Sequence, residues 1–394
     1  MAKTKPKTKP DKPRKDFPLG AANNGQWQKK IRGRIHYFGV WANPEAAEQE
    51  YLRQKEYLQA GRLPPAKTAT GVTMTDLCNK FLNAKRALRD TGELSGRTFN
   101  DYHAACAEIL DHFGSQRLVS DCGPDDFEKY RSKLGKSLGL HGIAKRVTQT
   151  KMLFTFAYAS ELIEKPIRFG QQFNRPSLKS MRIDRARKQK DHGLRMLEAT
   201  EIRTLLASAK PQLRAMILLA CNGGLGNSDV ANLPQSALQG DWLQYARVKT
   251  GVDRRIPLWP ETLQALSEAI ATRPRAKDAA DAGLCFLTRQ GRRWVRFGSN
   301  GSSIVDLVSD AFSKLLKKHD LKRPGLGFYA LRHGFETVSG GCKDQVATSS
   351  IMGHVDSSMA ENYRERIDDD RLLAVVNHVR EWLFFQTNLE EANA

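Results

Sequence analysis

The residues that could do chemistry together lie near the C-terminal end of the sequence. Arg332 stands in an L-R-H string, His354 in a G-H string, and Tyr363 lies nine residues beyond His354. A phenol can act as a nucleophile, while a guanidinium and an imidazole can donate hydrogen bonds to phosphate oxygens as negative charge builds there. Each of these residues alone is an ordinary helix or surface residue. Their order and spacing together predict an active site that attacks a phosphodiester.

Short helices around a glycine turn would bring these three side chains to one pocket. Arg332 begins a segment of helical character, and a helix over 345–352 is predicted to end at Gly353. A further helix over about 357–364 is predicted to carry Tyr363 near its end. These elements would place the cation, the imidazole and the phenol around a single phosphorus atom.

This string of motifs resembles the catalytic domain of the tyrosine recombinases, the phage integrase family. The resemblance covers about residues 72–385, weakly in the first half and strongly at the motifs. It implies that Tyr363 attacks a DNA phosphate to give a 3′-phosphotyrosyl bond and a free 5′ hydroxyl, and that a 5′ hydroxyl of a partner duplex reverses the reaction. The resemblance thus implies site-specific recombination or integration by a tetramer on double-stranded DNA, with no cofactor and no metal.

A second motif adds a candidate general acid. Residues 245–249, a turn with Gly251, and residues 254–258 predict a β-hairpin. In the family a lysine on such a hairpin lies eight residues before a proline, and Lys249 and Pro257 reproduce that interval. The resemblance implies that Lys249 protonates the departing 5′ oxygen. A solvated hairpin lysine without a catalytic role is the alternative.

The chain departs from the family pattern where a first phosphate-binding arginine is expected. An apolar helix over 213–221 leads into Gly224, and the box that follows has Gly226 at the arginine position and Asp229 at the acidic position. Losing a bidentate phosphate donor should cost on the order of 2–4 kcal/mol of transition-state stabilisation unless another group replaces it. Asp229 would still orient the neighbouring groups.

Several groups could replace the missing arginine. The backbone N–H of Gly226 with the amide of Asn227, or else Arg254 or Arg255 from the hairpin, could donate to the phosphate. Tyr329 stands where the family usually has histidine, and its phenol can donate one hydrogen bond but supplies no cation. The sequence therefore predicts slower or more partner-dependent chemistry, and it predicts that Gly226→Arg raises cleavage.

The N-terminal part of the sequence predicts a small β-hairpin and helix module. Residues 1–15 have the composition of a disordered basic tail, and residues 16–62 resemble the arm-type DNA-binding modules of integrases. Within that module, alternating residues predict a hairpin with its turn at Arg32-Gly33, followed by a helix over 44–60 with Asn43 as its cap. A Pro- and Gly-rich linker is predicted to follow.

The remaining sequence predicts two further domains in a mainly α, multi-domain chain with small β elements. Apolar residues at three- and four-residue steps predict a helical core-binding domain over 72–168. An irregular basic linker over about 167–189 leads to a mixed, mostly α catalytic domain over 190–385. Its last helix, over 369–385, has an apolar face that could pack on its own domain or dock on the next subunit.

The formal net charge of +20 favours a polyanionic partner, because neutralising phosphates releases condensed counterions. Individually, each basic residue is an ordinary surface charge. The candidate DNA-binding residues are Lys29, Lys30, Arg32, Arg34, Arg97, Lys145, Arg146, Lys151, Arg254 and Arg255.

The cysteines and the hydropathy of the chain predict a cytoplasmic protein. The six cysteines are scattered without a C-x-x-C pair, and the lysine- and proline-rich start carries no apolar leader segment. No apolar run approaches the roughly 20 residues that a bilayer-spanning helix needs. Reduced thiols, no membrane association and no structural metal site are therefore expected.

Two other functions stay open. A catalytically weakened or inactive DNA-binding protein of the same fold is favoured by Gly226, although the retention of Tyr363, His354, Arg332 and Lys249 argues against it. A type IB topoisomerase shares the phosphotyrosine chemistry, but the arm-like N-terminal module favours an integrase.

Overall fold

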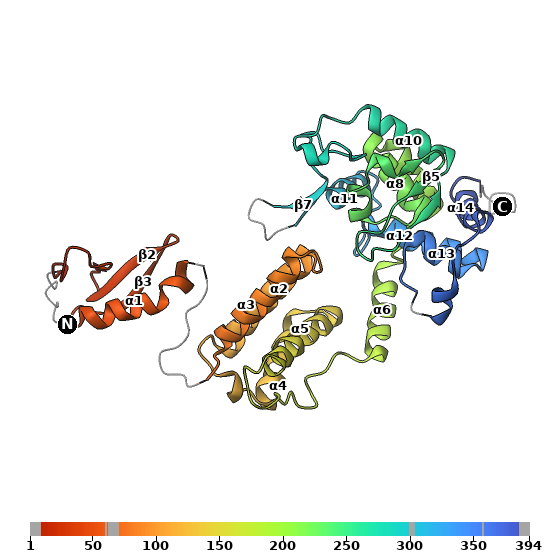
Figure 1. The fold of residues 1–394 in the computed structure, drawn as a ribbon. Helices are drawn as coiled ribbons and strands as arrows, with labels where there is room; N and C mark the ends of the chain where they lie inside the picture. Colours follow the sequence, from red (N-terminus) through yellow and green to blue (C-terminus); the bar gives the residue numbers. More distant parts are fainter. Residues whose placement is uncertain (1–8, 60, 62–70, 299–303, 357, 386–394) are drawn as a thin grey trace. The chain divides into compact units, whose positions relative to one another are not determined.

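The computed structural model consists of two compact units, Met1–Asp184 and Arg185–Ala394. The residues that the structure describes are 9–59, 61, 71–298, 304–356 and 358–385. Most of the predicted linker after the N-terminal module, and the first half of the predicted basic tail, therefore lie outside the described residues. Helices dominate both units and the sheets are small (Figure 1), which confirms the predicted mainly α, multi-domain fold class. None of the described helices combines the length and the apolar character needed to cross a bilayer.

The N-terminal part of the first unit is an antiparallel sheet packed against one helix. Its elements are β1 (Gly20–Ala21), β2 (Gln26–Ile31), β3 (Arg34–Val40) and α1 (Pro44–Gln59). β2 and β3 pair around Arg32 and Gly33, which both have positive φ angles, so the predicted hairpin and its turn are confirmed. The Asn43 side chain accepts a hydrogen bond from the N–H of Ala46 at 3.0 Å, which confirms the predicted cap of α1.

The core of this part lies between the sheet and α1. Trp27 of β2 and Tyr51 of α1 are buried in it, whereas Tyr37 of β3 is 50% exposed on the other face. Arg14, within the segment predicted as a disordered tail, forms an ion pair with Glu48 of α1 at 2.6 Å. The described end of the tail is therefore fastened to the helix.

Four helices form the other core of the first unit. They are α2 (Met74–Asp90), α3 (Gly96–Phe113), α4 (Pro124–Ser137) and α5 (Leu140–Ala159). Thr73 and Asp76 cap α2 reciprocally, and Ser95 caps α3. Phe127 contacts the rings of neighbouring phenylalanines in an aromatic core. The helices predicted from apolar spacing are confirmed.

A helix occupies much of the segment that was predicted to be an irregular linker. α6 (Leu178–His192) begins after Ser177, whose hydroxyl accepts a hydrogen bond from the N–H of Ser180 at 3.0 Å. None of its side chains is buried, so it lacks the apolar face on which the prediction of helices relied. Its helicity is consistent with its many Lys, Arg and Gln residues, which favour helix without packing. The prediction was wrong for this reason.

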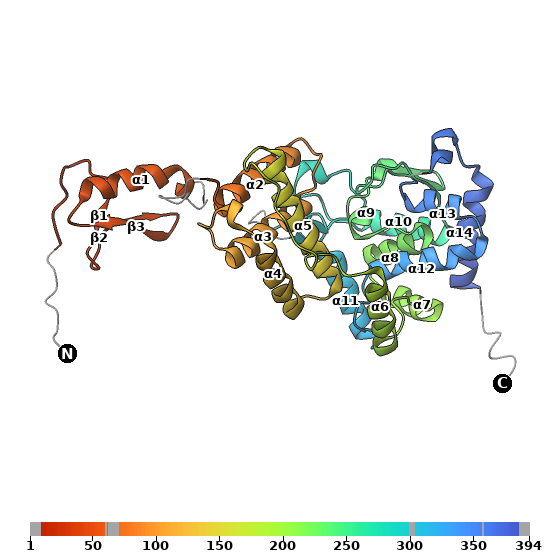
Figure 2. The same ribbon diagram turned by 90° about the horizontal axis from the view of Figure 1, so that it is seen from below.

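The second unit is built around one helix that is buried on every side. From Ala215 to Gly223 every residue of α8 (Pro211–Gly223) is buried, as expected for a helix that is apolar all round. Figures 1 and 2 show the helices α10, α12 and α14, which contact α8. The other helices of this unit are α7 (Ala199–Ser208), α9 (Asn227–Ala231), α10 (Pro260–Ala271), α11 (Leu307–Lys318), α12 (Tyr329–Ser339), α13 (Gln345–Met352) and α14 (Asp369–Phe384).

Two small antiparallel sheets complete the second unit. β4 (Leu238–Gln239), β5 (Trp242–Gln244) and β6 (Arg255–Pro257) form one sheet, and β7 (Val295–Phe297) pairs with β8 (Ile304–Asp306) in the other. The loop between β5 and β6 matters most for the site below, because it carries Lys249.

The last described helix, α14, packs on its own unit. Val376 and Val379 are buried, and the indole N–H of Trp259 donates to the carbonyl of Val376 at 2.9 Å. Leu373 of the same helix is 37% exposed. Of the two alternatives for this helix, the structure shows packing within the chain.

Candidate active site

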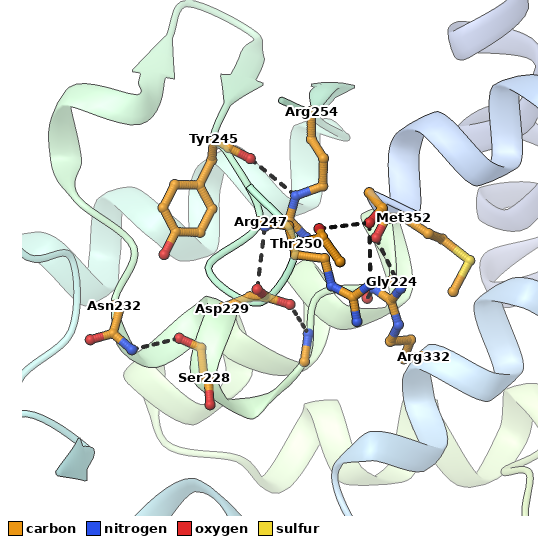
Figure 3. A network of polar contacts seen from close by, with 12 residues as sticks. Gly224, Ser228, Asp229, Asn232, Tyr245, Arg247, Thr250, Arg254, Arg332 and Met352 are labelled. Carbon is orange, nitrogen blue, oxygen red and sulfur yellow. Dashed lines mark hydrogen bonds and ion pairs between the residues drawn. The ribbon is translucent and has the colours of Figure 1, made fainter. Parts of the chain in front are cut away.

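Arg332 joins the two glycine turns of the predicted site. Its guanidinium donates from Nη1 to the carbonyl of Gly224, where α8 ends, and from Nη2 to the carbonyl of Met352, where α13 ends, at 2.9 Å (Figure 3). Both turns close with a glycine at φ 64°, Gly224 and Gly353, a conformation that favours glycine. Arg332 is only 2% exposed. A side chain predicted from a motif is thus the link that holds two distant turns together.

His354 lies directly against this guanidinium. Nη2 of Arg332 is 2.8 Å from Nε2 of His354, and an arginine can only donate, so Nε2 must be the acceptor. Burial, and after it the charge of Arg332, lowers the pKa of His354. The imidazole is therefore held neutral with its proton on Nδ1, from which it can donate to a phosphate oxygen.

The hairpin that carries Lys249 is present, but its strands are shorter than predicted. β5 ends at Gln244, and residues 245–249 continue only through isolated pairs, such as the N–H of Arg247 to the carbonyl of Val252 at 2.8 Å. The predicted strand over 245–249 is therefore wrong, because the chain begins to turn at Val248. Lys249 is exposed in this turn.

The tip of the hairpin is fastened to the turn that precedes His354. The hydroxyl of Thr250 donates to the carbonyl of Gly353 at 3.1 Å, and Nη1 of Arg247 donates to the same carbonyl at 3.2 Å. Lys249, which lies between these two residues, is thereby kept near the imidazole. The structure thus brings together the loop of Lys249, Arg332 and His354.

Arg247 is a site residue that the sequence did not single out. It is 8% exposed, and its Nε is buried without a hydrogen-bond partner. One signal could have found it. Alternate residues of an extended segment point to the same face, and Arg247 lies two residues before Lys249.

Asp229 is bound from two sides beneath the site. The N–H of Gly226 donates to Oδ2 of Asp229 at 2.9 Å, and Nη2 of Arg254 lies 3.4 Å from Oδ1. Nε of Arg254 donates to the carbonyl of Tyr245 at 3.0 Å (Figure 3). Burial lowers the pKa of Arg254, and Asp229 partly offsets that effect. Arg254 and Asp229 are thus a buried ion pair that connects the hairpin to α9.

Besides Arg254, which Asp229 and Tyr245 hold, the other three groups expected to replace the missing arginine are also engaged elsewhere. The N–H of Gly226 is bound to Asp229, and the amide of Asn227 donates to Asp306 at 3.1 Å and to Ser309 at 2.8 Å. Arg255 forms an ion pair with Asp369 and lies over the ring of Trp242, 3.8 Å from its centroid. These contacts hold the three groups away from a phosphate, because each would have to give up its partner first.

Tyr329 stands beside the position that lacks a side chain. A Cβ added to Gly226 would lie 3.3 Å from Cε2 of Tyr329 and 3.4 Å from Oδ2 of Asp229. Tyr329 is 46% exposed, and its ring packs edge-on against His333 with centroids 5.3 Å apart. The phenol is therefore accessible at the edge of the pocket.

Tyr363 is the predicted site residue that the structure leaves outside the buried cluster. It ends a 3₁₀ helix, η5 (Met359–Tyr363), so the α-helix predicted over 357–364 is wrong. Met359, at the start of this turn, is 69% exposed, so its side chain contributes little buried apolar surface to stabilise a longer helix. The side chain of Tyr363 is 80% exposed. No hydrogen bond joins it to Arg332, His354 or Lys249 among the described residues.

The basic candidates of the N-terminal module fall into two groups. Lys30, Arg32 and Arg34 are exposed along the hairpin. Lys29 points to the other face, where its ammonium lies over the ring of Tyr51, 4.8 Å from the centroid. The prediction that Lys29 is displayed for DNA is therefore weakened.

Most of the basic candidates in the helical part have intramolecular partners. Lys145 pairs with Asp101 at 2.8 Å, Arg146 pairs with Glu108, and Lys151 donates to Asn174 at 2.8 Å. Arg97 is exposed at the start of α3. The four residues are thus not equivalent, since only Arg97 is displayed without such a bond in the described part of the chain.

The charge of the site suits an anion. Arg247, Arg254 and Arg332 are all buried, while Asp229 is the carboxylate that contacts one of them. Buried cations in excess are costly unless an anion joins them. Within the described ranges, no group of three or more His, Cys, Asp and Glu side chains is placed to hold a metal ion.

The comparisons with known proteins point to one family. Residues 195–369 match the sequence profile of the phage integrase family, and no curated protein matches the chain. The chain is similar to a lambda integrase dimer bound to a COC′ core site, with a TM-score of 0.54 and 15% identity over 76% of this chain and 100% of that chain. It is also similar to a lambda integrase tetramer bound to a Holliday junction, with a TM-score of 0.54 and 17% identity over 90% and 98% of the two chains.

A transposon protein gives a further likeness. The Tn1549 transposon integrase in complex with circular intermediate DNA has a TM-score of 0.51 and 18% identity over 76% of this chain and 98% of that chain. Identities this low show a shared fold only. The profile match, in contrast, spans Arg332, His354 and Tyr363. Residues 195–369 therefore form a domain of the phage integrase family, that of the tyrosine recombinases.

Proposed function

We propose that the chain is a site-specific recombinase that cuts and rejoins double-stranded DNA with Tyr363 as its nucleophile. The observation that carries the proposal is the set of bonds made by Arg332. Its guanidinium fixes the turn at Gly224, the turn at Gly353 and the ring of His354 around one buried, positively charged pocket. Such preorganised donors stabilise a phosphorane-like transition state without further rearrangement.

The proposed reaction is a balanced transesterification. The hydroxyl oxygen of Tyr363 gives up its proton to solvent as it bonds to phosphorus, and the bond from phosphorus to the 5′ oxygen breaks. Lys249 donates a proton to the departing 5′ oxygen, while Arg332 and the Nδ1–H of His354 donate to the nonbridging oxygens. Tyr329 adds one neutral donor at the edge of the pocket. A 5′ hydroxyl of the partner duplex then attacks the phosphotyrosine and frees the tyrosine.

Tyr363 must approach the pocket for this chemistry. Its segment is short, and the side chains of Met359 and Tyr363 are exposed, so the segment can move with little loss of buried surface from these two residues. We propose that bound DNA, or a neighbouring subunit on DNA, brings the phenol to the phosphate. Exchange between two duplexes requires four active sites, and a homotetramer on DNA is therefore part of the proposal.

The rest of the chain has proposed roles in holding DNA. Residues 16–62 form an arm-type module that presents Lys30, Arg32 and Arg34, and residues 72–168 form a core-binding domain that presents Arg97. Residues 190–385 form the catalytic domain. The basic helix α6 then lies between the two larger domains in the sequence.

A DNA-binding protein of the same fold that does not cleave is the second candidate. Two observations favour it: Gly226 lacks the first arginine of the family, and Tyr363 is not held in the pocket. The two candidates share DNA binding and differ in whether a covalent bond forms.

Covalent trapping separates these functions. The purified protein selects its site from a random duplex library, and the site is then nicked close to the scissile phosphate so that the cut strand diffuses away. We expect a protein–DNA adduct that survives denaturation with the wild type and with Tyr158→Phe, another exposed tyrosine, but not with Tyr363→Phe. The proposed recombinase would be excluded if Tyr363→Phe formed as much adduct as the wild type, or if neither the wild type nor any variant formed an adduct. Relaxation of a supercoiled plasmid that lacks the selected site would instead indicate a type IB topoisomerase.

A further inference from the structure

Two buried guanidinium groups bond to consecutive carbonyls in the turn before His354. Nη2 of Arg332 donates to Met352 at 2.9 Å, and Nη1 of Arg247 donates to Gly353 at 3.2 Å. Consecutive residues are about 3.8 Å apart along the chain, so the two bonds bring the guanidinium groups close together. Arg332 comes from α12 and Arg247 from the hairpin, so the fold has gathered them from distant parts of the sequence.

Among the described residues, no ion pair joins either of these two cations to a carboxylate. After burial, the charge of Arg247 contributes most to lowering the pKa of Arg332, which shows how strongly the two groups act on each other. The nearby carboxylate of Asp229 is bound by Arg254 and by the N–H of Gly226. Nε of Arg247 is buried and has no hydrogen-bond partner. Two repelling cations with an unused donor form a site for an anion with several oxygens.

The position of Gly226 shows which group is missing from this anion site. The family carries a phosphate-binding arginine there, three residues before the acidic residue, and here the acidic residue Asp229 is retained. Asp229 binds Arg254, which has come from the hairpin instead. The carboxylate that the missing arginine would meet is therefore bound by a hairpin residue, while Tyr329 lies nearest to the empty position at Gly226.

We propose that Arg247 supplies the second phosphate-binding guanidinium, in place of the side chain absent at Gly226. It and Arg332 bind the nonbridging oxygens of the scissile phosphate between them. Arg254 is a positioning residue, because it holds Asp229 and the base of the hairpin. The inference rests on the proposed function, since it names the residue that completes the same site.

Arg254 itself is less suited to touch the phosphate. Its side chain is fully buried, and both terminal nitrogens are inaccessible as well as without a hydrogen-bond partner. Arg247 keeps 8% of its surface exposed, beside the loop that presents Lys249; its Nε is buried, but its Nη2 is not among the buried unsatisfied atoms and has no hydrogen bond among the described residues. A phosphate can therefore reach Arg247 without opening the core, whereas it cannot reach Arg254 in this way.

A neutral phosphate analogue tests the charge role of Arg247. On the nicked site, Arg247→Met is expected to lower the rate of adduct formation about 100-fold. When a methylphosphonate replaces the scissile phosphate, the substrate lacks the negative charge that the guanidinium would neutralise. The rate of adduct formation by Arg247→Met should then be less than about 10-fold below that of the wild type. Arg247→Lys, which keeps the charge but not the planar fork, should fall between wild type and Arg247→Met.

The matched control is Arg380→Met. Arg380 forms a bidentate ion pair with Glu261 elsewhere in the same unit, and its variant should cleave both substrates like the wild type. Wild-type rates with Arg247→Met, or an equal loss on phosphate and methylphosphonate, would overturn the inference and leave the proposed function intact.

Inorganic phosphate provides a test that needs neither a DNA site nor cleavage. At constant ionic strength, phosphate is expected to raise the Tm of the wild-type chain and of Arg380→Met, because the ligand binds the folded state. The increase should be smaller in Arg247→Met, and comparing shifts within each variant removes any change in basal stability. An increase in Arg247→Met equal to that of the wild type would contradict the inference, even if the wild type forms no adduct and the proposed function fails.

Discussion

The two halves of the candidate active site are held in opposite ways. Arg332 is 2% exposed and bonds to two turns and an imidazole, whereas Tyr363 is 80% exposed at the end of a 3₁₀ turn. Rotamers and hydrogen bonds fix the first half before any DNA is bound. In the second half, Met359 and Tyr363 are exposed, and the described ion pair that brackets their segment joins Asp356 and Arg364.

This difference indicates where such a protein can be controlled. A pocket that is already built supplies electrostatic stabilisation at no cost of rearrangement when the reaction occurs. A nucleophile on a weakly held segment can be withheld until DNA and neighbouring subunits place it. Cleavage would then depend on assembly, which limits breakage of DNA by a lone subunit.

The substitution expected to have the largest effect is Arg332→Ala, which removes the centre of the buried half. The variant removes hydrogen bonds to two buried carbonyls and to His354, and each unsatisfied buried group costs about 1–3 kcal/mol. We expect the free energy of unfolding to fall by about 3 kcal/mol, and adduct formation to fall about 100-fold or more. Urea denaturation and the trapping assay measure the two effects. Unchanged stability would show that Arg332 does not join the two turns.

Gly226→Arg is expected to have different effects on cleavage in two backgrounds. The sequence alone predicts that it raises cleavage. In the structure, the new Cβ would lie 3.3 Å from the ring of Tyr329, and Asp229 is already paired with Arg254. We therefore expect no gain in the wild type, but about a 10-fold gain in Arg247→Met, where a guanidinium is missing.

This coupling is measured from the trapping rates of four proteins: the wild type, Gly226→Arg, Arg247→Met and the variant that carries both substitutions. A gain of the same size in both backgrounds would mean that Arg247 does not compensate for Gly226. Gly226→Ala is the matched control, because it adds the Cβ without the guanidinium.

Local patterns predicted much of the fold and the centre of the site. Apolar spacing identified α2 to α5, and the glycine at 353 identified the turn that positions His354. Arg247 was missed because its role depends on a bond to Gly353, 106 residues away, which no local pattern encodes. α6 was missed because it has no buried face, and the helix predicted around Tyr363 is a 3₁₀ turn in which Met359 and Tyr363 are exposed. Predictions therefore failed where tertiary contacts, or their absence, decide the structure.

The pH dependence of stability should report on the buried half. Burial and the charge of Arg332 hold the pKa of His354 below its usual value of 6.5, with a further contribution from Arg247 and an opposing one from Glu336. A histidine with a lowered pKa in the folded state takes up protons more readily when unfolded. Its contribution to stability is therefore intact above about pH 6.5 and is lost as the pH falls through the folded-state pKa.

His354→Asn isolates this contribution, because its side-chain oxygen can still accept from Arg332. Other histidines, including His112 and His333, also have lowered pKa values and remain in both proteins. Below pH 6.5 the free energy of unfolding should decline less steeply in His354→Asn than in the wild type. Parallel curves from urea denaturation at several pH values would show that His354 is not held neutral.

The smallest expected effect is that of Tyr363→Phe on stability. Removing a hydroxyl from a side chain that is 80% exposed should change the free energy of unfolding by less than about 0.5 kcal/mol. The same variant should abolish the covalent adduct, so its catalytic and structural effects separate completely, unlike those of Arg332→Ala. A loss of stability near that of Arg332→Ala would mean that Tyr363 is already seated in the pocket of the free protein. In that event the nucleophile would be built in, and control by assembly would have to act at another step.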